Sequence, residues 1–66
     1  MWSEELQEQT REYFKRLPIA AMKKVGGRYG VATMQDGKFI IQDRETDQTS
    51  VFECIEELIE ADWAID

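Results

Sequence analysis

Polar and apolar residues near the N-terminus recur with the period of a helix. Ser3 precedes two glutamates and is typical of an N-cap, because a serine hydroxyl accepts a backbone N–H of the first turn and acids there suit the helix dipole. At about 100° per residue, one stripe of the segment is mainly apolar; it consists of Leu6, Thr10, Tyr13, Phe14 and Leu17. The pattern predicts an amphipathic helix over residues 3–17.

Pro18 interrupts this pattern. Proline disfavours helical geometry in the preceding residue but suits the first turn of a new helix. Apolar residues then recur at intervals of three before a glycine pair that would stop a helix; these are Ile19, Met22, Val25, Gly26 and Gly27. We predict a second helix over residues 18–25, or a single helix over residues 3–25 with a kink at Pro18.

The period changes to two after the glycine pair. Two alternating runs, residues 29–35 and 38–43, are separated by Asp36-Gly37, a pair that supplies the positive φ angles of a tight hairpin turn. A two-residue loop fixes the register, so that Met34 opposes Phe39, Ala32 opposes Ile41 and Gly30 opposes Asp43 on one face. The opposite face then carries Tyr29, Val31 and Ile40.

The C-terminal third has a second amphipathic pattern. Residues 44–49 are polar and predict a loop, with an optional short third strand near residues 49–52. Ser50 and Glu53 have the spacing of a capping box, which predicts a last helix over residues 51–61. Acids fill one side of that helix and form a ridge of Glu53, Glu56, Glu57 and Glu60.

These elements predict one small α+β domain over residues 1–66. The predicted order is α-α-β-β-α, with an antiparallel hairpin packed against helices, because an isolated two-stranded ribbon is not stable and needs a cover. The last helix is the expected cover of the Phe39 face. A chain this short buries a small fraction of its surface, so association with another chain is an expected source of stability.

Composition removes several classes of function. The net charge of the chain is −6. The chain has no histidine and one cysteine, and this disfavours acid–base or nucleophilic catalysis and leaves no cluster of zinc ligands. We therefore expect no enzyme activity, no cofactor and no small-molecule substrate. The start of the chain lacks a signal-peptide pattern and no apolar run is long enough to span a membrane, so we expect a cytoplasmic protein that does not bind membranes.

Charge is segregated along the chain. Residues 11–28 carry +5, whereas residues 43–66 carry −8. The basic residues allow an alternative function, a nucleic-acid-associated regulator whose helix pair contacts phosphates; they are Arg11, Lys15, Arg16, Lys23, Lys24 and Arg28. Nucleic acid is the less expected partner, because the net charge of the chain is negative. A further alternative is an acidic mimic of nucleic acid that uses the ridge from Glu53 to Glu60.

The hairpin face that carries Tyr29, Val31 and Ile40 is the remaining candidate. Either the N-terminal helices cover it, or it stays open beside a free strand edge and pairs with another chain. Together with the acidic ridge, this face predicts a non-enzymatic protein-binding or regulatory module, self-associating or part of a complex. No resemblance to a known family supports a narrower function.

Overall fold

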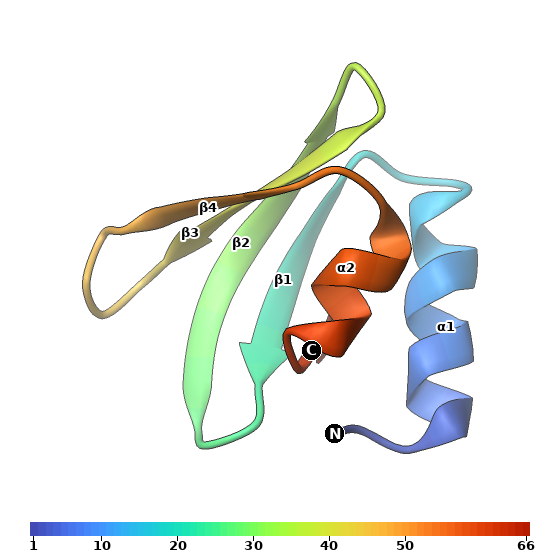
Figure 1. Ribbon diagram of the computed structural model, residues 1–66, viewed down its shortest axis with the longest axis horizontal. Coiled ribbons are helices and arrows are strands. Elements are labelled where there is room, and N and C mark those ends of the chain that lie inside the picture. The colour runs from blue at the N-terminus through green and yellow to red at the C-terminus, as the bar shows by residue number, and fades with distance from the viewer.

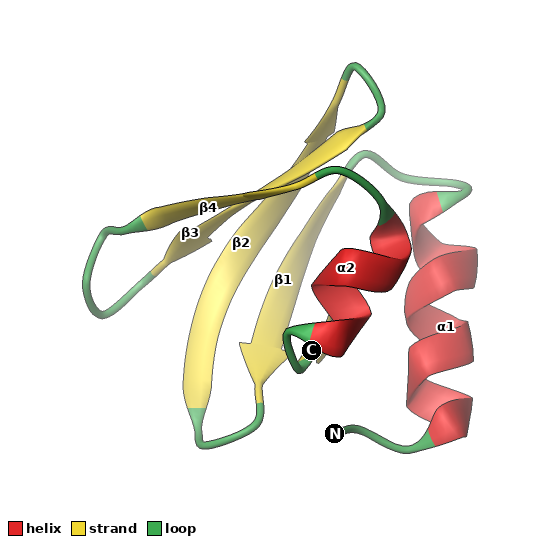
Figure 2. Ribbon diagram, in the orientation of Figure 1, coloured by secondary structure: helices red, strands yellow, loops and turns green.

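Five strands form one antiparallel sheet, and two helices lie side by side on one of its faces (Figures 1 and 2). The computed structural model describes residues 1–66. The strand order is β4-β3-β2-β1-β5. Along the chain the elements are α1 (Glu4–Phe14), β1 (Ile19–Lys24), β2 (Arg28–Gln35), β3 (Lys38–Asp43), β4 (Thr49–Phe52), α2 (Ile55–Glu60) and β5 (Trp63–Ile65). The α+β class is confirmed, but the predicted element order is wrong.

The first helix begins as predicted. The Ser3 side chain accepts the Leu6 N–H at 3.2 Å and caps α1. The apolar stripe turns Thr10 and Phe14 into the core, and the Phe14 ring packs edge-on against Phe39 with centroids 5.1 Å apart. The helix ends at Phe14, three residues before the predicted end.

The predicted second helix is wrong, because residues 19–24 form strand β1. Ala20 and Met22 point into the core and alternate with exposed neighbours, and β1 pairs with β2 on one side and β5 on the other. In the strand the i, i+3 spacing has no role, because Ile19 and Met22 lie on opposite faces and only Met22 is buried. Hydrogen bonds to two flanking strands outweigh the helix preference of alanine, methionine and lysine. Gly26 and Gly27, with φ of 104° and 85°, form the β1–β2 turn.

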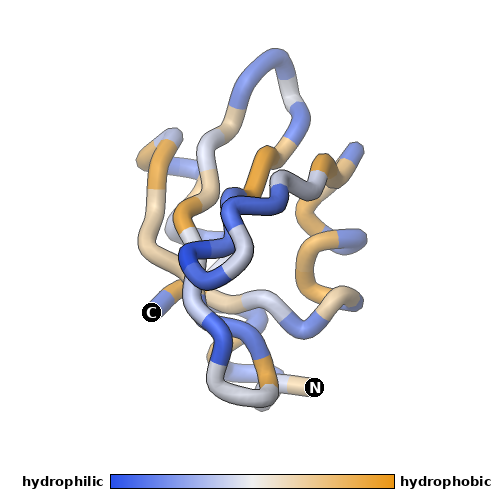
Figure 3. The backbone as a smooth tube through the Cα atoms, turned by 90° about the vertical axis from the view of Figure 1, so that its left-hand side faces the viewer, coloured by the Kyte–Doolittle hydropathy of each residue, from blue (hydrophilic) through white to orange (hydrophobic).

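The central hairpin has the predicted register. Met34 pairs with Phe39, Ala32 with Ile41, and Gly30 with Asp43. Asp36 and Gly37 both have positive φ, as the two-residue turn requires. The β2–β3 turn at the top of Figure 3 is hydrophilic, and the inward-facing Ala32, Phe39 and Ile41 are buried.

The start of the last helix is wrong by four residues. Residues 49–52 form β4, which is the optional third strand of the sequence analysis, and α2 begins only at Ile55. Ser50 is therefore not an N-cap. Cys54 occupies that position without a side-chain cap, and the Glu57 carboxylate accepts the Glu53 N–H at 2.7 Å instead.

The end of the chain returns to the sheet. Instead of a helix that continues to residue 61, α2 ends at Glu60, and Asp62 adopts a φ of 69° that turns the chain into β5. Met22, Lys23 and Lys24 of β1 pair with β5. The fold therefore closes by placing its last strand beside its first.

The core lies between the helices and one face of the sheet. It contains Phe14, Ala20, Met22, Ala32, Phe39, Ile41, Leu58, Ile59 and Trp63. As predicted, Phe39 and Ile41 are buried, and Leu58 and Ile59 of the last helix belong to the same cluster. Neither helix is long and apolar enough to cross a membrane.

Candidate functional site

No helix covers the face of the sheet that points away from α1 and α2 (Figure 1), although Ala64 at its β5 end is buried. We call this face the outer face. Because side chains alternate along each strand, the pairing pattern assigns to it Ile19, Ala21, Lys23, Tyr29, Val31, Thr33, Gln35, Lys38, Ile40, Gln42, Thr49, Val51 and Ala64. Ile19, Tyr29 and Val51 are about half exposed. The predicted cover of this face by the N-terminal helices is therefore wrong, since α1 packs on the other side and residues 19–24 belong to the sheet.

Four β-branched side chains cross the outer face in one row. Ile19 pairs with Thr33, Thr33 with Ile40, and Ile40 with Val51, so the row runs through β1, β2, β3 and β4. We call these four residues the β-branched stripe. Solvated faces of antiparallel sheets are usually polar, and three of these four side chains are purely aliphatic. The stripe is the longest apolar feature on the outer face.

The outer face carries no acid, although the chain holds 14. Its two charges are lysines, and each has a partner within the chain. Lys23 Nζ lies 5.1 Å from the centroid of the Trp2 ring, and Lys38 Nζ lies 3.7 Å from Glu53 Oε2. The outer face thus carries few charges in an acidic molecule: Glu53 neutralises Lys38, and Lys23 keeps its positive charge over the Trp2 ring.

The sequence placed three members of this face correctly and missed two. Tyr29, Val31 and Ile40 lie on the face opposite Phe39, as the hairpin register predicts. Ile19 and Val51, the most exposed members of the stripe, were assigned to helices. No alternation of polar and apolar residues marks Ile19 as a strand residue, because Ile19-Ala20-Ala21-Met22 is apolar throughout.

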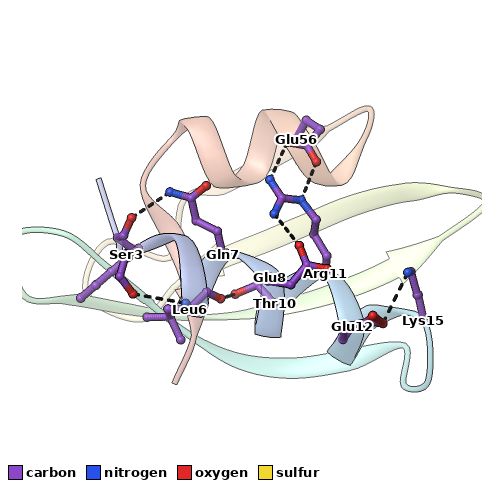
Figure 4. A network of polar contacts seen from close by, with 10 residues as sticks. Ser3, Leu6, Gln7, Glu8, Thr10, Arg11, Glu12, Lys15 and Glu56 are labelled. Atoms are coloured by element: carbon purple, nitrogen blue, oxygen red, sulfur yellow. Dashed lines mark hydrogen bonds and ion pairs between the residues drawn. The ribbon is translucent and has the colours of Figure 1, made fainter.

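The acidic ridge lies at the other side of the molecule, on α2 and just before it. Glu53, Glu56, Glu57 and Glu60 are all exposed. Glu56 is held by α1, because Arg11 Nε donates to Glu56 Oε1 at 2.7 Å and Arg11 also contacts Glu8 (Figure 4). This hydrogen-bonded pair lowers the pKa of Glu56 and raises that of Arg11.

The basic residues proposed for phosphate contacts do not share one surface. The predicted helix pair that would present them is absent, since Lys23 and Lys24 lie on β1 and Arg28 on β2. Several of the six have partners in the chain: Arg11 with Glu56, Lys15 with Glu12, Lys23 over Trp2, Lys24 over Trp63 and Arg28 with Asp43. Arg16 makes no ion pair and lines an open groove of about 400 Å³ with Leu17 and Ile65.

Asp43 forms a polar cluster at the end of β3. Its Oδ1 accepts the backbone N–H groups of Glu45 at 2.8 Å and Thr46 at 3.3 Å, and its Oδ2 lies 2.9 Å from Arg28 Nη2. A cavity of about 130 Å³ adjoins the cluster and is also lined by Lys24 and Trp63. The backbone donors, aided by the charge of Arg28, lower the pKa of Asp43 against the opposing effect of burial.

Replacing Asp43 with asparagine is expected to remove a pH-dependent part of the stability. Because the folded state lowers the Asp43 pKa, the stabilisation is complete above the unfolded value near 3.8 and is lost as pH falls through the folded value. Urea denaturation of the wild type and Asp43→Asn should therefore show a stability difference that is constant at neutral pH and narrows below about pH 4. Asp36→Asn, at an exposed turn, is the matched control, and a difference that stays constant down to about pH 2 would contradict the role of the charge.

The chain matches no family model, and neither a curated protein nor a solved structure is significantly similar to it.

Proposed function

We propose that this chain is a non-catalytic protein-binding module that associates with a second copy of itself through the outer face. The observation that carries the proposal is the exposed β-branched stripe on a face without acids. An uncovered apolar sheet face is unusual on a small monomer and marks an interaction surface. The lack of histidine supports the non-catalytic part of the proposal.

Charge favours a second copy as the occupant. All 14 acids lie outside the outer face, so two like faces can meet without bringing carboxylates together. Lys23 and Lys38 are held by Trp2 and Glu53. The stripe itself carries no charge, so an apolar face fits it better than a strongly charged partner does.

Sheet packing gives the expected geometry. Two antiparallel sheets stack about 10 Å apart with their rows of side chains interdigitated, as in a β-sandwich. The stripe crosses three strand spacings, about 14 Å. Such a patch is smaller than the roughly 800 Å² per partner of a stable interface, so we expect a weak dimer with a dissociation constant in the micromolar range or above.

Association would also supplement a small core. Only 13 of the 66 residues are buried in the single chain. Burial of apolar area adds about 25 cal/mol per Å², so covering Ile19, Tyr29 and Val51 would stabilise the fold at high protein concentration. The thermal midpoint should therefore rise with protein concentration.

Ile19→Lys is the variant that tests the proposal. Ile19 lies on β1 in the stripe and is 54% exposed, so the substitution should leave the fold intact and place a charge in the dimer interface. Sedimentation equilibrium from about 10 µM to about 1 mM should show the wild type shifting from one chain to two, with at least a tenfold weaker association for the variant.

Leu17→Lys is the matched control. Leu17 is 48% exposed but lies in the groove beside α1, outside the outer face. It should associate like the wild type. A wild-type mass of one chain at about 1 mM, or equal weakening by both substitutions, would refute self-association through this face.

A further inference from the structure

The two edges of the sheet are treated differently by the fold. At the β5 edge, Thr10 of α1 is fully buried, and its hydroxyl accepts the Ile65 N–H at 3.2 Å while donating to the Leu6 carbonyl at 2.8 Å. Helix α1 therefore closes that edge. No element lies beyond β4, which is the last strand at the opposite edge of the sheet (Figure 1).

The free edge of β4 presents backbone groups of two residues. Asp43 donates its N–H to the Gln48 carbonyl at 2.9 Å, which makes Gln48 a residue that bonds to β3. Hydrogen-bonding direction alternates along an antiparallel strand, so Thr49 and Val51 direct their N–H and C=O groups away from β3.

The edge strand β4 is short, at four residues, but lacks three of the usual protections of an edge. Edge strands are commonly guarded by lysine, proline or a bulge, and β4 contains none of these. Its sequence Thr-Ser-Val-Phe consists mainly of residues that favour strands, and Val51 is 55% exposed. One more strand can therefore form backbone hydrogen bonds with the β4 edge.

Acids flank β4 at both ends. Asp47 precedes the strand and makes no ion pair. Glu53 follows the strand, and its carboxylate makes one ion pair, with Lys38 at 3.7 Å. Glu45 and Glu57 add two more carboxylates in the adjacent loop and helix turn, also without ion pairs. An added strand would therefore meet negative charge at both of its ends.

These charges argue against pairing with the β4 of a second copy. A two-fold axis at Ser50 pairs Thr49 with the Val51 position of the other copy and uses all the outward backbone groups, but it places Asp47 opposite Glu53 twice. Like charges directly opposite one another destabilise a strand pair. A segment with basic ends fits the same edge without this repulsion.

We propose that the β4 edge binds an extended segment of another protein, with β-branched or apolar residues at its centre and lysine or arginine at both ends. Main-chain hydrogen bonds to Thr49 and Val51 supply the affinity, and the flanking carboxylates select the basic ends. Thr49 and Val51 also place their side chains on the outer face, but the edge binds through their backbone groups. Ile19→Lys, three strands away on β1, tests the proposed self-association without altering this edge, so the two proposals can fail independently.

A synthetic peptide provides a direct probe. The probe is a fluorescent nonapeptide of alternating valine and threonine with two lysines at each end, tested by fluorescence anisotropy at low salt. A second peptide carries glutamates in place of the lysines, and a third is N-methylated on alternate central amides. We expect the lysine peptide to bind at least tenfold more tightly than either of the other two, and its affinity to fall as salt is added.

Thr49→Pro tests the edge from the side of the protein. Proline is tolerated on an edge strand where the N–H faces solvent, so the variant should fold yet lose a donor to the bound segment. It should bind the lysine peptide at least tenfold more weakly, whereas Thr49→Val, which keeps the N–H, should bind within about twofold of the wild type. The paired neutralisation Asp47→Asn with Glu53→Gln should weaken binding and flatten its salt dependence.

Several results would overturn the proposal. These are equal binding of the three peptides, no binding of the lysine peptide, or unchanged binding by Thr49→Pro. Another is a change in sedimentation mass caused by Thr49→Pro but not by Thr49→Val, which keeps the N–H; this would assign the edge to a second copy of the chain. Because the N-methylated peptide leaves the protein unaltered, the test holds even if Thr49→Pro does not fold.

Discussion

Gly30→Ala is expected to lower the free energy of unfolding by about 2 to 3 kcal/mol. Gly30 is buried in β2, and an added Cβ would lie 2.7 Å from the Gln42 carbonyl oxygen and 3.2 Å from both Ile41 Cγ2 and Trp63 Cη2. The nearest of these atoms is backbone of the neighbouring strand, so it cannot move without disturbing the sheet. For a domain of this size the thermal midpoint should fall by roughly 10 to 20 °C.

Whether Gly30→Ala lowers or raises the free energy of unfolding shows whether tight packing around Gly30 or the strand preference of alanine dominates. Alanine at an ordinary strand position is more favourable than glycine by roughly 0.5 to 1 kcal/mol. A stabilised Gly30→Ala would therefore contradict the close approach of Gln42 and Trp63 to Gly30. Gly27→Ala is the control, because that position has open space around it but a φ of 85°. It should lose about 1 kcal/mol from backbone strain alone.

Leu58→Ala is expected to cost about 3 to 4 kcal/mol. Leu58 is fully buried between α2 and the sheet, and removal of its side chain leaves a cavity among core residues that include Ile41 and Trp63. A domain of 66 residues has roughly 3 to 10 kcal/mol of stability in total. We therefore expect a measurable unfolded fraction at 37 °C, detectable by urea denaturation followed by tryptophan fluorescence.

Volume-conserving and exposed substitutions complete the comparison. Leu58→Met should cost less than about 1.5 kcal/mol, because methionine fills nearly the same space. Leu17→Ala, at a position 48% exposed, should change stability by less than about 0.5 kcal/mol. Equal losses at Leu58 and Leu17 would contradict the placement of α2 over the sheet.

The central hairpin shows which parts of this fold are encoded locally. Asp36-Gly37 sets both the turn type and the register, because a two-residue loop allows one pairing of its flanking strands. The register in turn sends Phe39 and Ile41 into the core and leaves Ile40 outside. Ser3 acts in the same local way, since its cap requires only the next three residues.

The misassigned segments have patterns that two structures can satisfy. Residues 19–24 fit a helix on propensity and spacing, but they form β1 because β2 and β5 pair with both of its edges. Ser50 and Glu53 fit a capping box, but residues 49–52 pair with β3. In both segments, hydrogen bonds to residues distant in sequence decide the structure.

The candidate surface depends on the same distinction. Tyr29, Val31 and Ile40 could be placed on one face from the hairpin alone. The β-branched stripe could not, because Ile19 and Val51 join it only once β1 and β4 exist as strands. The free β4 edge likewise could not be predicted, because it depends on the strand order and on α1 closing the β5 edge instead.

Local sequence suffices for the helix cap at Ser3, for the hairpin turn with its register, and for the α+β class. Contacts between distant segments are needed to make strands of residues 19–24 and 63–65, to select the strand over the helix at residues 49–52, and to leave the outer face and the β4 edge open. Caps and tight turns are satisfied by near neighbours, whereas a strand becomes stable only when another strand completes its hydrogen bonds.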